Sequence, residues 1–114
     1  MRPVVVNANT EGSWSQPVVL DYHLTPNNTL IEVNFNGNTG GTYTVQYTID
    51  DPYAAYATDL NTNGLWWNHP TLVNLTASNI DNMNVPARAI RLLANTAGTG
   101  GTPIMTIVQA GGIS

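Results

Sequence analysis

The clearest pattern in the chain is a two-residue alternation of apolar and polar positions in its middle third. Ile31, Val33 and Phe35 alternate with more polar neighbours, and over residues 42–49 aromatic and β-branched side chains alternate with Thr and Gln. A period of two is that of a half-buried β-strand. We therefore predict two strands, joined as an antiparallel hairpin by the Asn- and Gly-rich turn at residues 36–41.

A second hairpin is predicted near the end of the chain. Residues 88–94 and 104–109 flank residues 95–102, which are rich in Gly, Thr and Ala and indicate a loop. Ala, Arg and Leu in the first of these segments are also good helix formers, but Pro86 before it and its β-branched partner favour a strand. Residues 17–22 predict a further short strand.

The stretch from residue 50 to residue 84 predicts a long loop excursion with short strands around residues 65–67 and 71–75. Residues 1–16 are expected to form an extended N-terminal arm, within which Val4 to Val6 could also be an edge strand. The fold class is all-β, and residues 17–114 are expected to form a single antiparallel β-sandwich domain. The sandwich would be jelly-roll or immunoglobulin-like, with about six to eight short strands.

Charge is unusually scarce, at 9% of the residues, against about 25% in an ordinary soluble domain. The net charge of −4 rests on seven acidic residues and on Arg2, Arg88 and Arg91. So few cations argue against nucleic acid as a partner. No apolar run approaches the roughly 18 residues of a membrane span. On a strand, Arg88 and Arg91 would point to opposite faces, so one could pair with Asp21, Asp50 or Asp51 while the other makes a surface contact.

Candidate chemistry is sparse. His23 and His69 stand alone, without the neighbouring Cys, His or Ser residues that mark metal or nucleophile motifs. Asp50, Asp51 and Asp59 lack the spacing of a calcium loop, and a turn explains them better. The sequence contains no Cys. We therefore expect no catalytic residue, no cofactor and no metal site.

The tryptophans are the remaining candidates. Trp66 and Trp67 are adjacent, so on a strand their side chains point to opposite faces and at most one of them enters the core. The other would pack under a loop, stack on a sugar ring or anchor a protein interface, where Trp is over-represented. The interface candidates are Arg2 in the expected arm, Trp14, Trp66 and Trp67.

Four segments of the chain, taken as a set, carry a resemblance to known proteins. They are YTVQYTIDDP at residues 43–52, WWNHP at 66–70 with Leu72, VPARAIRL at 85–92 and IVQAG at 107–111. Over residues 17–112 the chain resembles a group of small structural proteins of tailed bacteriophages.

The resemblance implies a non-enzymatic virion protein, and a capsid decoration or cement protein in particular. It would be made in the cytoplasm of the bacterial host and would lie on the capsid surface. Its partners would be the major capsid protein and copies of itself, assembled as a homotrimer. The resemblance supplies no catalytic motif. The alternative is a carbohydrate-binding or host-attachment module in a head fibre or tail, whose exposed Trp would bind a glycan. A hydrolase ranks third.

Overall fold

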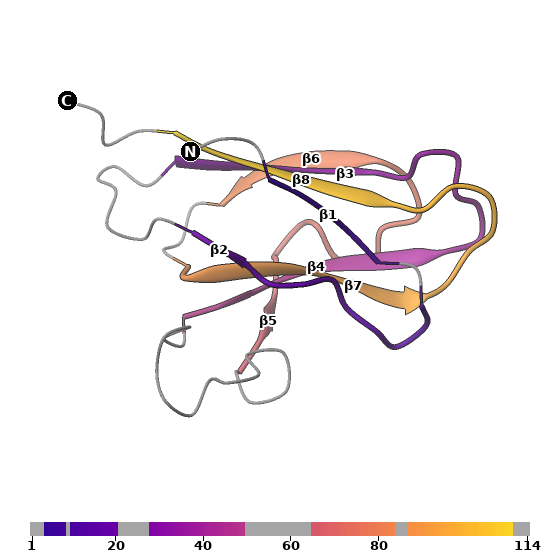
Figure 1. Cartoon of the computed structure of the whole chain (residues 1–114), viewed down its shortest axis with the longest axis horizontal. Helices are drawn as coiled ribbons and strands as arrows, with labels where there is room; N and C mark the ends of the chain where they lie inside the picture. The colour runs from indigo at the N-terminus through magenta and orange to yellow at the C-terminus, as the bar shows by residue number, and fades with distance from the viewer. Residues whose placement is uncertain (1–3, 9, 21–27, 50–64, 84–86, 111–114) are drawn as a thin grey trace.

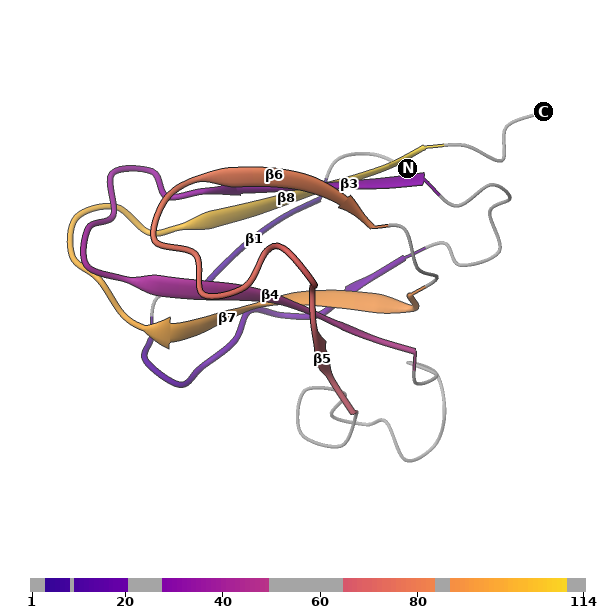
Figure 2. The same cartoon turned by 180° about the vertical axis from the view of Figure 1, so that it is seen from behind.

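In the computed structural model, the described part of the chain forms eight strands in two antiparallel sheets (Figures 1 and 2). The structure describes residues 4–8, 10–20, 28–49, 65–83 and 87–110, and no helix occurs among them. The strands are β1 (Val4–Asn7), β2 (Val18–Val19), β3 (Asn28–Asn34), β4 (Thr42–Thr48), β5 (Trp67–Asn68), β6 (Asn79–Met83), β7 (Ala89–Thr96) and β8 (Ile104–Ala110).

The topology is that of a jelly roll. Sheet A has the order β1-β8-β3-β6, and sheet B has the order β2-β7-β4-β5. The pairs β1–β8, β2–β7, β3–β6 and β4–β5 are nested in the sequence like one long hairpin. Wrapping that ribbon round the core brings β3 beside β8 and β4 beside β7. The predicted antiparallel β-sandwich is therefore confirmed, in its jelly-roll form.

The core lies between the two sheets. Ile31 and Val33 on β3 face Tyr43 and Val45 on β4, and all four are completely buried. The rings of Phe35 and Tyr43 pack edge to face with their centroids 5.2 Å apart, a favoured aromatic geometry. The inward side chains are thus those that the period-two pattern selected.

Both predicted hairpins are wrong in their pairing. β3 pairs with β6 and β8, while β4 pairs with β5 and β7, so the loop at residues 36–41 crosses from sheet A to sheet B. The loop between β7 and β8 makes the return crossing. Each connection is long enough to span the core, and alternation identifies the buried face of a strand but not its partner.

Two other segments differ from expectation. Residues 71–75 form no regular strand, whereas the polar residues 79–83, expected to be loop, form β6. Within the expected arm, the alternative of an edge strand at Val4 to Val6 is confirmed, because β1 pairs with β8 at the edge of sheet A and buries part of Val4 and Val6 against the core. In a free arm, Val4 and Val6 would be exposed to water and would lose the stabilisation that this burial provides.

Candidate functional site

A row of three polar side chains crosses the outer face of sheet B. Gln46 on β4 lies opposite Arg91 on β7 and opposite Asn68 on β5. Arg91 donates from Nε to Oε1 of Gln46 over 2.8 Å, and Gln46 donates from Nε2 to Oδ1 of Asn68 over 3.0 Å. Cross-strand neighbours on one face are close enough for such bonds. The row therefore fixes the direction in which each amide points.

Two tryptophans from opposite edges of sheet B both pack on the guanidinium of Arg91. The guanidinium carbon of Arg91 lies 4.4 Å from the centroid of the Trp14 ring and 4.2 Å from that of Trp66. Both distances are within the range of cation–π attraction. Arg91 is 6% exposed, Trp66 is partly exposed and Trp14 is 39% exposed. We call Trp14, Trp66, Arg91, Gln46 and Asn68 the Trp–Arg cluster.

Backbone hydrogen bonds hold both tryptophans in place. Beside Trp14, the N–H of Ser15 donates to Leu92 O over 2.8 Å, and the N–H of Ala94 donates to Ser13 O over 2.9 Å. On the other edge, the segment after Trp66 is held to β4 by a 2.8 Å bond from the His69 N–H to Val45 O. The rings are therefore carried by segments that are tied to the central strands of sheet B.

The electrostatics of Arg91 combine two opposing effects. Burial lowers the pKa of Arg91 to about 10, because a buried charge loses its hydration. The two indole rings and the carbonyl of Gln46 act the other way, because they stabilise the cation. Arg91 is consequently charged at neutral pH, and it contacts two indole rings and an amide group. The aspartates expected as its partners, Asp21, Asp50 and Asp51, lie outside the described residues.

Trp67 lies on the opposite face from Trp66, as predicted. It is paired with Tyr47 and is 52% exposed. Ile49 and Leu65, at the same end of sheet B, are each 60% exposed. Their setting is apolar, in contrast to the polar row beside Trp66.

The outer face of sheet A is a second candidate surface. Four large apolar side chains, one from each strand, are between 37% and 58% exposed there: Val5, Leu30, Ile80 and Val108. Glu32 lies directly opposite Ile80 in the same face. It is the one charged side chain on this face in the described part of the chain. We call these five residues the sheet A patch.

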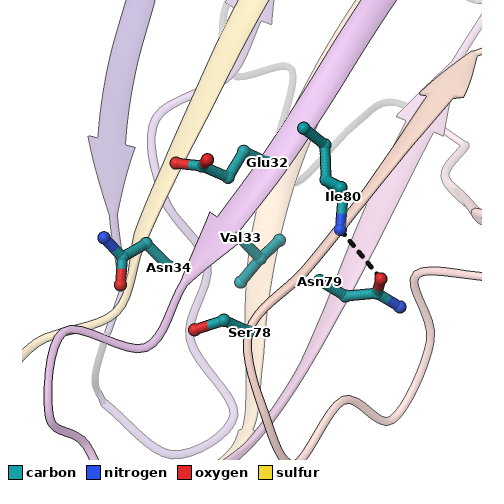
Figure 3. Close-up of a pocket in the computed structure, with 6 residues that line it drawn as sticks. All are labelled: Glu32, Val33, Asn34, Ser78, Asn79 and Ile80. Carbon is teal, nitrogen blue, oxygen red and sulfur yellow. Dashed lines mark hydrogen bonds between the residues drawn. The ribbon is translucent and has the colours of Figure 1, made fainter.

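A shallow depression of about 240 Å³ lies at the β6 side of this patch (Figure 3). Glu32 and Ile80 line it together with Asn34, Asn79 and Ser78. The Asn79 side chain accepts a 2.8 Å hydrogen bond from the Ile80 N–H, drawn as the dashed line in Figure 3. The depression thus offers a carboxylate, amides and one apolar wall.

His69 is buried and has a structural role. It is 2% exposed, and its Nδ1 accepts the N–H groups of Thr71 and Leu72, each over 3.1 Å. Nε2 therefore carries the proton and donates it to Asn82 O over 3.1 Å. Nearby, Asp81 accepts hydrogen bonds from the Thr71 hydroxyl and the Asn82 N–H, and these lower its pKa from 3.8. Nε2 of His69 thus joins the segment after β5 to β6, while Nδ1 fixes the turn that follows His69.

The other sequence candidates fall elsewhere. Arg2 lies outside the described residues, as do five residues weighed for metal, base or ion-pair roles: Asp21, His23, Asp50, Asp51 and Asp59. Within the described ranges, no group of three or more His, Cys, Asp or Glu residues could hold a metal ion. No helix there is long and apolar enough to cross a membrane.

The structure brings Trp14 and Trp66 together, and sequence reasoning missed the residues that join them. Arg91 and Gln46 meet only because β7 pairs with β4, which the alternation pattern does not reveal. The sheet A patch could have been detected in part from the sequence. Leu30 lies on the side of its strand where the other residues, Glu32 and Asn34, are polar. Comparisons of the chain with protein-family models, curated proteins and solved structures found no match.

Proposed function

We propose that this protein is a non-enzymatic structural protein of a bacteriophage virion that binds the major capsid protein and stabilises the head. The observation that carries the proposal is the sheet A patch, with four exposed apolar side chains and a single charge. Apolar area with few ions is what the centre of a protein interface needs, because ions are costly to desolvate.

Two further points support the proposal. The chain resembles small tailed-phage structural proteins over residues 17–112, and charged residues make up only 9% of it. The jelly roll also occurs in viral shells, although it occurs in lectins too and architecture alone does not assign a function. The choice between a shell protein and a lectin therefore depends on the chemistry of the exposed surfaces.

The mechanism would be mechanical. A protein that binds the assembled shell and not its separate subunits stabilises the shell by mass action. The sheet A patch would lie on the capsid protein, and a hydrogen-bond donor or cation of that partner would enter the depression beside Glu32. Copies of the chain, as a homotrimer, would repeat this contact over the shell.

The test uses virions purified from the phage that encodes the chain. Leu30→Asp, which places a charge in the sheet A patch, should abolish cosedimentation with the particles. Val19→Asp is the matched control, because Val19 is 38% exposed but lies on sheet B. Both variants should remain folded. Cosedimentation of both variants, or absence of the protein from purified virions, would refute the proposal.

The copy number separates the positions in the virion. A ratio to the major capsid protein near one to one indicates decoration of the whole shell. A few copies per particle would instead assign the chain to the tail or to a head fibre, and would contradict the capsid-decoration form of the proposal.

A further inference from the structure

The Trp–Arg cluster presents aromatic and amide groups side by side on an exposed sheet face. Trp14 is 39% exposed although the guanidinium of Arg91 lies 4.4 Å from the centroid of its ring. Asn68 is exposed on the same face. Its Oδ1 is engaged by Gln46, so its Nδ2 group points away from that residue.

These groups are also held rigidly before any ligand arrives. Trp14 is flanked by backbone bonds to β7, and the guanidinium contacts both indoles at 4.4 Å or less. Orientation of side chains by their neighbours reduces the entropy that binding would cost. A flat ligand that needs both an apolar surface and hydrogen-bonding groups would find both here.

We propose that the outer face of sheet B binds a neutral saccharide chain, with a pyranose ring stacked on Trp14 and sugar hydroxyls bonded to Asn68. A pyranose has an apolar C–H face that packs on indole and a rim of hydroxyls that bond to amides. Gln46 completes the polar row and orients the Asn68 amide.

A neutral ligand fits better than an acidic one. The cationic group of the cluster, Arg91, is already covered by two rings and bonded to Gln46. The net charge of the chain is −4, so it repels anions at long range. This inference is independent of the capsid proposal, because it concerns the other sheet and survives if the sheet A patch binds nothing.

The experiment titrates the full chain with soluble hexasaccharides and follows tryptophan fluorescence. The probes are β-1,4-linked glucose, β-1,4-linked N-acetylglucosamine and, as the acidic comparison, α-1,4-linked galacturonic acid. Binding of a neutral probe is expected, and Trp14→Ala should weaken it about tenfold or more. Trp67→Ala is the matched control, since it removes the adjacent indole from the opposite face and should leave affinity unchanged.

Two variants guard against a simple loss of folding. Asn68→Ala removes an exposed amide and should weaken binding while leaving the melting temperature near that of the parent. Arg91→Lys keeps the charge but not the planar guanidinium that orients the rings, and should also weaken binding in the folded protein. Failure of both neutral probes to bind, binding of the acidic probe alone, or full affinity in Asn68→Ala and Trp14→Ala would each overturn the proposal.

Discussion

Thr39 and Thr99, which are 60 residues apart in the sequence, exchange two backbone hydrogen bonds of 2.8 and 2.9 Å. They lie in the two loops that cross between the sheets, so each loop fastens the other. Nearby, Asn38 donates from Nδ2 to Gly101 O over 2.9 Å. One end of the sandwich is therefore closed by a small contact between loops that were both expected to be hairpin turns.

The first prediction concerns the packing of these loops. A Cβ atom on Gly101 would overlap the carbonyl oxygen of Asn36, which is backbone and cannot move away easily. Gly101→Ala should therefore lower the free energy of unfolding by about 2–3 kcal/mol. In Gly40→Ala the new Cβ meets no atom within 4 Å, and only the strain of a φ of +80° remains, costing about 1 kcal/mol. Urea denaturation of both variants checks the difference, and equal losses would contradict it.

The second prediction concerns His69. His69→Ala leaves two N–H groups and one carbonyl without their imidazole partners, and should cost about 3 kcal/mol of unfolding free energy. His69→Asn should cost less, because an amide oxygen can take the place of Nδ1. Thermal unfolding ranks the variants, and hydrogen exchange at the Leu72 amide reports the local bond. An alanine variant as stable as the parent would show that the imidazole does not join the sheets.

The third prediction concerns acid stability. Hydrogen bonds from the Thr71 hydroxyl and the Asn82 N–H lower the pKa of Asp81 in the folded chain below its ordinary value of 3.8. A lowered folded pKa means that the carboxylate stabilises the fold at higher pH, and that this contribution disappears as the pH falls through the folded pKa. The stability difference between the parent and Asp81→Asn should thus be constant near neutrality and should shrink in acid.

Thr71→Ala is the control for this acid effect, because the Thr71 hydroxyl is the largest cause of the lowered pKa. In the Thr71→Ala background, Asp81→Asn should change the pH dependence much less. Denaturation curves over a series of acidic buffers measure all four proteins. An undiminished effect of Asp81→Asn without the Thr71 hydroxyl would rule out this coupling.

The fourth prediction concerns β1, which had been expected within a free arm. Val6 points toward the core and Val5 points outward, where it is 58% exposed. Val6→Asp buries a charge and should cost several kcal/mol, roughly 3 or more, whereas Val5→Asp should change stability by less than about 1 kcal/mol. Thermal denaturation compares them. Equal melting temperatures for the two variants would mean that β1 does not hold its place in sheet A.

The sequence predicted which side chains are buried more successfully than which strands are neighbours. Tyr43 and Val45 were identified as inward-facing by their period-two pattern, and both are fully buried. Thr44, on the other side of β4, was expected to face solvent, yet it is 1% exposed. Its hydroxyl donates to Oδ1 of Asn95 and accepts the Asn74 N–H, and neither residue is near Thr44 in the sequence.

Some features of the candidate sites were also predictable from the sequence and others were not. The scarcity of charged residues and the opposite orientations of Trp66 and Trp67 were predictable. The meeting of Trp14 and Trp66 over Arg91 could not, because each residue comes from a different part of the folded ribbon. β6 escaped detection because its polar residues lie at the edge of sheet A, where one side of a strand needs little apolar character.

The alternation of apolar and polar residues was sufficient to predict the all-β class and the inward face of the main strands, since alternate residues of a pleated strand must point to opposite sides. It could not predict that β3 lies beside β8 and β4 beside β7, because these pairings depend on the packing of the whole fold. An apolar strand face gains nearly the same free energy against any suitable partner. The partner is set by the wrapping that buries all eight strands at once, and this choice created the Trp–Arg cluster on one sheet and the patch around Glu32 on the other.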